Sequence, residues 1–318
     1  MSRYIIKRLI SMVFVVLGVA VLIFTIMYFT PGDPVRLLLG SDATPADIAK
    51  KAAQLGLDQP YIIQLGRFLT DLFFRFDFGT SYIFNSPVIS DLFIRVPYTL
   101  AVGMLCMLLQ VGIGIPLGVT AAVNQNRSTD RICMFIALFG VSIPSFWLGL
   151  MLVLLFALHL GILPPFGVGG IEYFVLPCIA NSFSGIATQA RQTRSSMLEV
   201  IRSDYITTAR AKGMRERDVI YKHALPNALI PVITVIGNGF AMMLGGAVVI
   251  ENVFSIPGVG MFMTNAITSR DYPVVRGSVV FLSIVFSFVI LLVDIIYAYV
   301  NPRIKAQYES GQGRMSHA

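Results

Sequence analysis

This sequence has few charged residues. Lys, Arg, Asp and Glu together make up 13% of its 318 residues, half of the ~25% typical of soluble domains. Apolar residues reach 56%. A water-soluble chain of this length needs much more charge to cover its surface. The composition therefore argues against an ordinary soluble enzyme and for a protein surrounded by lipid.

Cysteine is scarce too, with three residues in the whole chain. Cys106, Cys133 and Cys178 all fall within apolar stretches, at spacings that bear no relation to one another. An odd number at such spacings predicts neither a disulfide framework nor a zinc site. We interpret these residues as small buried apolar side chains.

The usual signatures of catalysis are missing as well. The sequence has no Gly-x-x-x-x-Gly-Lys-[Ser/Thr] loop for ATP. His159, His223 and His317 show no metal-ligand spacing, and none lies in the interior of an apolar stretch. An intramembrane serine protease using Ser184 would need such a histidine as its base. We therefore predict a non-catalytic chain that binds no metal or cofactor of its own.

The abundant apolar residues are gathered in six stretches, most of them near or above the ~20 residues that a membrane helix needs. The stretches are 9–30, 98–123, 132–160, 174–190, 228–254 and 278–300. The first has 22 residues, more than the apolar core of about 7–15 in a signal peptide, so we expect it to be retained. Lipid cannot satisfy open backbone groups, so each stretch must be helical. The predicted fold is all-α, a polytopic membrane protein with six transmembrane helices.

Lys and Arg are concentrated in the segments that share the N-terminal side, which predicts that both termini are cytoplasmic. The C-terminal part of this bias rests on Arg303, Lys305 and Arg314. The net charge of +7 follows from the same bias and is no sign of nucleic-acid binding. The predicted parts are a cytoplasmic N-terminus with the first helix (1–30) and an extracytoplasmic loop or cap (31–97). They are followed by a five-helix core (98–303) that contains a cytoplasmic loop (191–227), and by a cytoplasmic tail (304–318).

The external segment 31–97 is longer than a simple connection needs. A helix is predicted over Pro45–Leu57, with Thr44 as its N-cap. The segment also holds a group of aromatic residues: Phe68, Phe73, Phe74, Phe76 and Phe78. We expect a small cap, which either shields the ends of the spans or docks a partner.

The cytoplasmic segment 191–227 is the most charged part of the chain, with eight Lys and Arg residues between Arg191 and Lys222. A helix is predicted over Arg191–Lys212, ending at Gly213 because glycine accepts the left-handed conformation. A second short helix is predicted from Met214 to Leu225, broken by Pro226. Its imperfect apolar side suits either a solvated surface helix or a docking element for a partner.

The fifth apolar stretch has small and flexible residues in its middle. Glycines allow close helix approach, and methionines form an adaptable apolar wall. Two acidic residues, Glu251 and Asp294, lie within spans and are functional candidates. These acidic residues leave open an ion-coupled carrier. The simpler interpretation of Asp294 is a structural one, in which hydrogen bonds between helices satisfy its carboxylate. A scaffold without transport is disfavoured by the glycines. The pathway or gate candidates are Met242, Met243, Gly245, Gly246, Glu251 and Asp294.

The run Thr207-Thr208-Ala209, then Gly213, nine residues, and His223-Ala224-Leu225-Pro226 resembles the cytoplasmic loop of permease subunits of bacterial ABC importers. The general family pattern has Glu-Ala-Ala at the start and Ile in place of His223. These departures resemble the dipeptide/oligopeptide/nickel branch, and its B-type dipeptide permeases most. Further segments resemble that branch along the chain: 4–9, 31–34, 55–60, 77–79, 193–197, 270–274 and 301–303.

The resemblance implies a type I ABC importer permease fold and a place in the bacterial cytoplasmic membrane. It implies a homologous second permease, two cytoplasmic ATPases that bind ATP and Mg²⁺, and an extracytoplasmic substrate-binding protein. The residues expected to couple this chain to an ATPase are Ala209, Gly213, Met214, Arg215, Arg217, Asp218, His223, Leu225 and Pro226. Di- and oligopeptides are the expected cargo. Nickel chelates, glutathione and opine metallophores remain alternatives within the same class.

Overall fold

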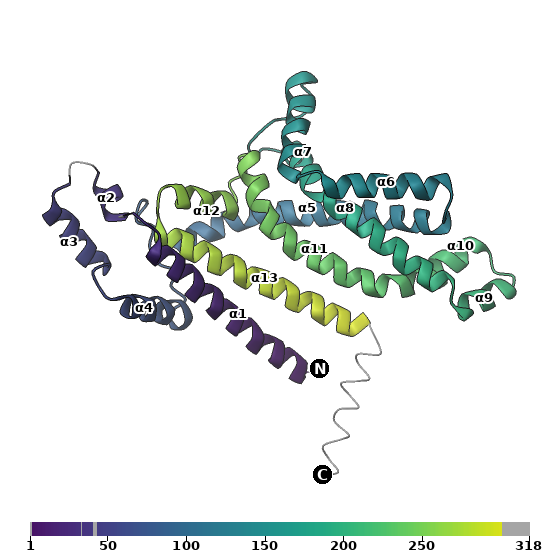
Figure 1. Cartoon of the computed structure of the whole chain (residues 1–318), viewed down its shortest axis with the longest axis horizontal. Coiled ribbons are helices and arrows are strands. Elements are labelled where there is room, and N and C mark those ends of the chain that lie inside the picture. Colours follow the sequence, from purple (N-terminus) through teal and green to yellow (C-terminus); the bar gives the residue numbers. More distant parts are fainter. Residues whose placement is uncertain (1, 33, 41–42, 301–318) are drawn as a thin grey trace, which may run out of the picture. The chain divides into compact units, whose positions relative to one another are not determined.

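The computed structural model describes residues 2–32, 34–40 and 43–300 (Figure 1). The predictions for Arg303, Lys305, Arg314, His317 and the 304–318 tail lie outside these residues. The helices are α1 Ser2–Phe29, α2 Pro34–Leu39, α3 Pro45–Leu55, α4 Tyr61–Phe74, α5 Val88–Val123, α6 Ser128–Ser142, α7 Ser145–Leu152, α8 Glu172–Ile201, α9 Asp204–Ala211, α10 Glu216–Asp218, α11 Leu225–Val253, α12 Val259–Thr268 and α13 Tyr272–Val300. Two π-helical segments, Val153–His159 and Val219–Ala224, complete the described helical structure.

The chain divides into two compact units. Unit 1 comprises 1–6, 100–255 and 289–318, and unit 2 comprises 7–99 and 256–288. In unit 1, α8 packs against α6, α7 and α11. In unit 2, the apolar core joins α1, α4, the start of α5, α12 and the start of α13. The all-α prediction is confirmed for the described residues.

Most of the predicted spans are present as long apolar helices. Four helices are long and apolar enough to cross a membrane among the described residues: Ile5–Phe29, Val88–Val123, Glu216–Met243 and Tyr272–Ile295. The stretch 174–190 lies inside the continuous 30-residue helix α8, which is not in that group. The buried polar residues Ser182 and Gln189 lie within this stretch and make it the least apolar of the six.

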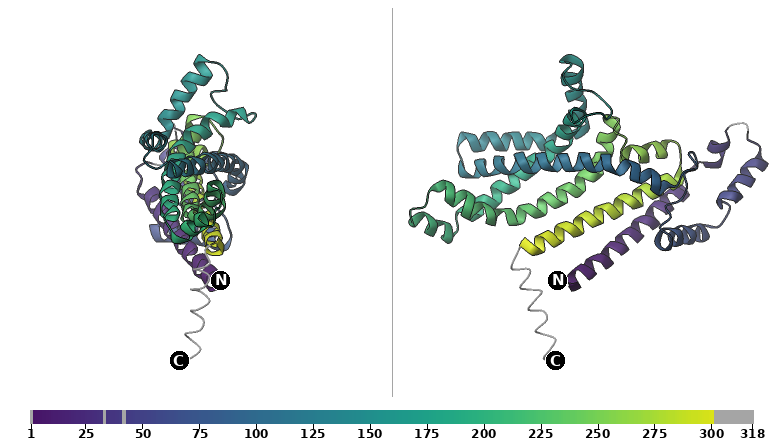
Figure 2. Two further views of the ribbon diagram at one scale, coloured as in Figure 1. Left: turned by 90° about the vertical axis from the view of Figure 1, so that its right-hand side faces the viewer. Right: turned by 180° about the vertical axis from the view of Figure 1, so that it is seen from behind.

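The apolar stretch predicted as a span over 132–160 is not one continuous helix. The segment is a broken pair, in which Ser128–Ser142 and Ser145–His159 are bent by 100° (Figure 2). Pro144 causes the break, because it lacks an N–H and forces the residue before it out of helical geometry. Ile143 is accordingly extended, with φ −89° and ψ 123°.

The predicted cap helix in segment 31–97 is present in unit 2. Its N-cap is Thr44, whose hydroxyl accepts a 3.3 Å hydrogen bond from the Asp47 backbone N–H. The helix ends at Leu55 rather than Leu57, because Gly56 takes the left-handed conformation with φ +69°. Further on, the buried Asp271 carboxylate accepts hydrogen bonds from the Ser81 hydroxyl at 2.5 Å and the Tyr82 N–H at 3.1 Å. These bonds tie the segment after α4 to the start of α13.

Helices α5 and α8 approach closely along a seam of alternating glycines and polar side chains. The Gln110 amide of α5 lies against Gly185 of α8, while Gln189 and Thr193 of α8 lie against Gly114 and Gly118 of α5. On each helix the three positions are four residues apart, so they lie on one face. A Cβ atom added at Gly118 would lie 2.5 Å from the Ala190 carbonyl oxygen. The absence of side chains at these glycines is what lets the two backbones approach.

An ion pair between the buried Asp130 and the half-buried Arg194 fixes the connection between α5 and α6 to α8. The Arg194 guanidinium donates to both carboxylate oxygens of Asp130, at 2.6 and 2.7 Å. The Asn126 N–H adds a 2.9 Å bond to the same carboxylate. Hydrogen bonds from Arg194, and secondarily from Asn126, hold the pKa of Asp130 below its ordinary value. The folded pKa therefore lies below the unfolded value of ~3.9, so the pair stabilises fully above that pH and is lost as the pH falls through the folded pKa.

We expect Asp130→Asn to lower the free energy of unfolding by about 2 kcal/mol at neutral pH, because it leaves the Arg194 charge without its partner. Thermal unfolding of the purified chain in lipid nanodiscs measures the effect. The difference from wild type should shrink in strong acid, where the wild-type carboxyl is protonated. Asp218→Asn is the control, since Asp218 belongs to an exposed i,i+4 pair and should change little. Equal stability of D130N and wild type at neutral pH would contradict this role.

Candidate functional site

The charged segment 191–227 lies in unit 1, where α9 and α10 project beyond the ends of α8 and α11 (Figures 1 and 2). The prediction of a single helix over Arg191–Lys212 is wrong. Helix α8 ends at Ile201, Ser203 is extended, and α9 begins at Asp204. The predicted end at Gly213 is confirmed, because this glycine has φ +76°. The break at Ser203 places α9 in a separate direction from α8.

The second predicted helix is present, but Pro226 does not break it. A short α-helical turn, Glu216–Asp218, continues as the π-helical segment Val219–Ala224 and then directly as α11. Pro226 lies in the first turn of α11, where a helix tolerates a residue without an N–H. The Leu225 N–H bonds to the Ile220 carbonyl, five residues back. The element is therefore joined to α11 without an intervening loop.

One side of this element is buried in an apolar cluster. Val219, Ile220 and Ala224 are buried together with Ala209 of α9 and Met197 of α8. Met214 and Leu225 pack against the same cluster. The apolar side predicted for the short helix is thus filled by neighbouring helices. The element is held firmly by the rest of unit 1.

The other side of the element is polar and exposed. Arg215, Arg217 and Lys222 are exposed, and Tyr221 presents 55% of its surface. Lys222 pairs with Asp218 at 2.7 Å, and this pairing lowers the pKa of Asp218. The predicted His223 is half-buried, and its carbonyl accepts a 2.8 Å bond from the Asn227 amide. The result is a rigid surface with cationic and aromatic side chains.

A second ion pair, not anticipated from the sequence, closes the turn around Gly213. The Arg210 guanidinium binds both carboxylate oxygens of Glu216, at 3.1 and 2.7 Å. The bonds lower the pKa of Glu216 and raise that of Arg210. The signal in the sequence is an arginine and a glutamate placed on either side of a turn glycine. This pair links the end of α9 to the start of the element that follows.

The glycines of α11 are approached from two sides. A Cβ at Gly237 would lie 2.2 Å from a methyl of Val293 on α13, and a Cβ at Gly239 would lie 2.9 Å from the Gln110 amide on α5. Gly245 has open space around it, and Gly246 lies in the same helix. Close approach therefore occurs at two glycines of this helix.

The two candidate methionines have different surroundings. Met242 is 76% exposed, whereas Met243 is 7% exposed and its methyl group approaches Gly185 of α8. The Gln110 amide lies at the same place, between Gly185 and Gly239. Gln110 was missed in the sequence, where a single glutamine in a span gives no signal of its neighbours. Its position makes it a further polar candidate at the meeting of α5, α8 and α11.

The structure does not bring Glu251 and Asp294 into one site. Glu251 is fully buried near the end of α11. Asp294, half-buried on α13, follows Val293, which packs on Gly237. Gly237 and Glu251 are fourteen residues apart, about 21 Å along a helix. Two acids at such a separation do not share an ion, and the described residues contain no group of three or more acidic, histidine or cysteine side chains suited to a metal.

The chain matches the models of two protein families. Residues 114–306 match the family described as binding-protein-dependent transport system inner membrane component. Residues 1–103 match the N-terminal part of a binding-protein-dependent transport system membrane component. Together the two matches cover nearly the whole chain.

Named relatives share about two-fifths of the sequence. A glutathione transport system permease protein of Salmonella paratyphi A is 40% identical over 305 residues, covering 96% of this chain and 99% of that protein. A dipeptide transport system permease protein of Alkalihalophilus pseudofirmus is 40% identical over 333 residues, covering 96% and 100%. The inward-facing methionine ABC transporter MetNI shares the fold, with a TM-score of 0.56 at 20% identity over 67% of this chain and 97% of that chain.

Proposed function

This chain belongs to the binding-protein-dependent transport system inner membrane components, and on that premise we propose that it forms half of the pathway of an ATP-driven importer for di- and oligopeptides. The main support for this proposal is the similarity, along nearly the full chain, to permeases named for dipeptides and for glutathione, which is a small peptide. Nickel chelates, glutathione and opine metallophores are the alternative cargo within the same class. The chain is a transport subunit and not an enzyme.

The partners follow from the same class. We infer a homologous second permease, two cytoplasmic ATPases that bind ATP and Mg²⁺, and an extracytoplasmic protein that delivers the cargo. The sequence has no ATP-binding loop, which fits a division of labour between subunits. The bias of Lys and Arg supports a multi-pass protein of the inner membrane with both termini in the cytoplasm.

The coupling to an ATPase is assigned to residues 209–226, and the exposed side of 214–226 is the proposed contact surface. The residues are those of the sequence prediction: Ala209, Gly213, Met214, Arg215, Arg217, Asp218, His223, Leu225 and Pro226. Ala209, Met214 and Leu225 support the element from its buried side, whereas Arg215 and Arg217 are free to meet a partner's surface. Because the element continues directly into α11, movement imposed on it is passed to a membrane helix. Such a two-state bundle, biased by ATP, provides alternating access.

The pathway is assigned to α11 and its neighbours. Met242, Gly245 and Gly246 are the proposed lining positions in its middle, with Met243 behind them. Glu251 is the proposed gate residue near one end of the same helix. Asp294 remains a pathway candidate, although its distance from Glu251 along the bundle disfavours an ion-coupled carrier that uses both acids.

Uptake by proteoliposomes containing the complete transporter tests this proposal. Labelled L-alanyl-L-alanine should accumulate only with ATP inside and the binding protein outside, and a proton ionophore should leave the rate unchanged. Asp294→Asn should retain at least about half of the uptake, whereas a carrier that moves protons through Asp294 would lose nearly all of it. Uptake that needs a proton gradient and not ATP would overturn the proposal.

A further inference from the structure

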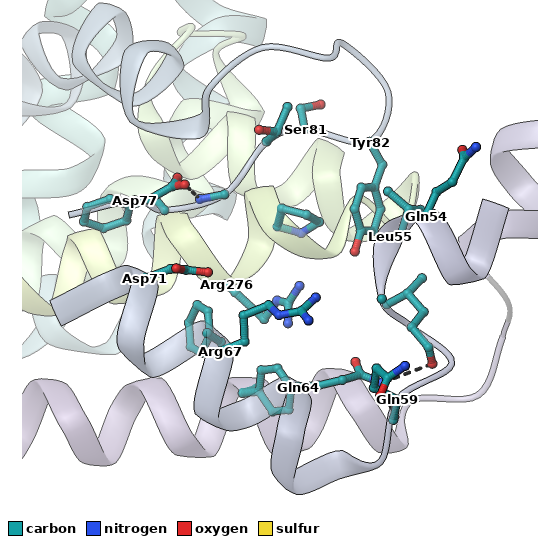
Figure 3. A pocket seen from close by; sticks show the side chains of 18 of the residues that line it. Gln54, Leu55, Gln59, Gln64, Arg67, Asp71, Asp77, Ser81, Tyr82 and Arg276 are labelled. Atoms are coloured by element: carbon teal, nitrogen blue, oxygen red, sulfur yellow. Dashed lines mark hydrogen bonds between the residues drawn. The ribbon is translucent and has the colours of Figure 1, made fainter. Parts of the chain in front are cut away.

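Unit 2 contains a cavity of about 330 Å³ whose lining mixes apolar and charged side chains. It lies among α3, α4, the segment 77–85 and the first turn of α13 (Figure 3). Its volume is at the low end of the range for small-molecule sites. The cavity is distinct from the coupling segment, residues 209–226, and from α11, both of which belong to unit 1. It has the size of a site for a ligand of few residues.

Three cationic side chains line the cavity: Lys51, Arg67 and Arg276. Among the described residues, none of them has a carboxylate within ion-pair distance. The Arg276 guanidinium lies 5.1 Å from the ring centre of Phe24 and 5.3 Å from that of Phe68, and its Nε donates to the Tyr272 carbonyl at 3.3 Å. Arg67 reaches across from α4 to the turn at Gly56, and both guanidinium groups extend into the cavity in Figure 3.

The two acidic residues of the lining are engaged elsewhere. Asp71 pairs with Arg75 at 3.0 Å, one turn along α4. Asp77 accepts a 2.8 Å bond from the Gly79 backbone N–H. The carboxylates thus hold their own local structure, while the guanidinium groups retain donors for a ligand. Two cations that share a cavity without a counter-ion are stabilised by an anion between them.

The other residues that line the cavity suit a ligand that contains amide groups. The Gln64 amide nitrogen donates to the Leu57 and Gln59 carbonyls at 3.1 and 2.8 Å, and its amide oxygen has no protein partner in the part of the chain that the structure describes. Gln54 and Asn85 add further amides to the lining, and Phe24, Phe68 and Phe78 give it apolar walls. A short peptide has a carboxylate, amide groups and small apolar side chains, which match these three features of the lining.

We propose that this cavity binds the terminal carboxylate of a short peptide, with Arg67 and Arg276 as its anchors. A planar guanidinium matches a carboxylate through two parallel hydrogen bonds. The choice of a peptide as ligand rests on the proposed function, whereas the recognition of a carboxylate rests on the cavity itself. The volume favours a dipeptide over longer chains.

Calorimetric titration of the full chain in nanodiscs of zwitterionic lipid tests the site. The probe is L-alanyl-L-alanine, and its C-terminal amide lacks the carboxylate. The amide should bind about tenfold more weakly or worse, the loss expected for one charged hydrogen-bonding group. Arg67→Gln should cause a similar loss for the free dipeptide and none for the amide. Lys50→Gln, an exposed change of the same kind outside the lining, should bind like wild type.

Arg276→Gln removes the cation from between two rings and can disturb folding. Arg67→Gln is therefore the variant on which the test of the site depends. Equal affinity for the dipeptide and its amide, no effect of Arg67→Gln, or no binding at all would overturn the site. Displacement of the dipeptide by equimolar glycerol 3-phosphate would reassign the cavity to a phosphate headgroup and overturn the peptide assignment. The uptake assay distinguishes the two proposals. Dipeptide uptake without binding at this cavity would overturn only the proposed site. Binding at this cavity without uptake would overturn only the proposed importer function.

Discussion

Replacing Gly118 with valine is expected to remove most of the folded chain from the membrane. A Cβ atom at this position would lie 2.5 Å from both the Ala190 carbonyl oxygen and the Thr193 Cβ. The first of these is backbone of α8, so no rotation of a side chain can relieve the overlap. Valine adds two methyl groups to it. Overpacking of this kind costs about 3 kcal/mol, a large share of the stability of a typical domain.

The measurements are the amount of protein in the membrane fraction and the midpoint of thermal unfolding after purification. Gly112→Val is the matched control, because Gly112 lies in the same helix and an added Cβ would meet nothing within 4 Å. That variant should accumulate like wild type. If the two valine variants behave alike, the close approach of α5 and α8 is not what holds unit 1 together.

Reversing the charge at both Arg215 and Arg217 is expected to lower uptake at least tenfold while leaving the protein in the membrane. Both side chains are exposed on the polar side of the coupling segment, and a partner's surface that accepts two cations repels two carboxylates. The buried side, with Val219, Ile220 and Ala224, is not touched, so folding should be normal. ATP hydrolysis by the complex should continue without transport.

The control for this experiment is Arg127→Glu, a reversal at another exposed residue of the connection between α5 and α6. It should leave uptake unchanged. Gly213→Asp is a second route to the same defect, because it places a side chain and a charge at the φ +76° turn that Arg210 and Glu216 close. Normal uptake by the double reversal, with the chain present in the membrane, would contradict the assignment of this segment.

The features that the sequence predicted correctly are local ones. The Thr44 cap, the turn at Gly213 and the long apolar helices depend on side-chain chemistry within a few residues, or on the need of a backbone in lipid for internal hydrogen bonds. The family pattern around Gly213 carried the functional prediction in the same way. Such features could be predicted because no distant neighbour competes with them.

The failures came where a proline or a distant partner decides. Pro144 breaks its span, and Ile143 before it is extended. Pro226 does not break its helix, because Leu225 before it keeps helical geometry, with φ −58° and ψ −47°. The pair Asp130–Arg194 joins two helices 64 residues apart in the sequence, whereas the pair Arg210–Glu216 is local and depends on the direction of the turn at Gly213. Gln110 is a candidate only because its amide lies against Gly185 and Gly239 of two other helices. None of these contacts follows from periodicity along a single helix.

The uninterrupted junction at Leu225 has a mechanical consequence. Helix α11 has 29 residues and is therefore a rod about 43 Å long. A tilt of about 5° at the loop end moves the far end, where Glu251 lies, by about 4 Å. Pro231, a turn and a half into the rod, is the joint at which such a tilt can be absorbed. Under the proposed coupling, the displacement that reaches Glu251 depends on how rigid α11 is at Pro231.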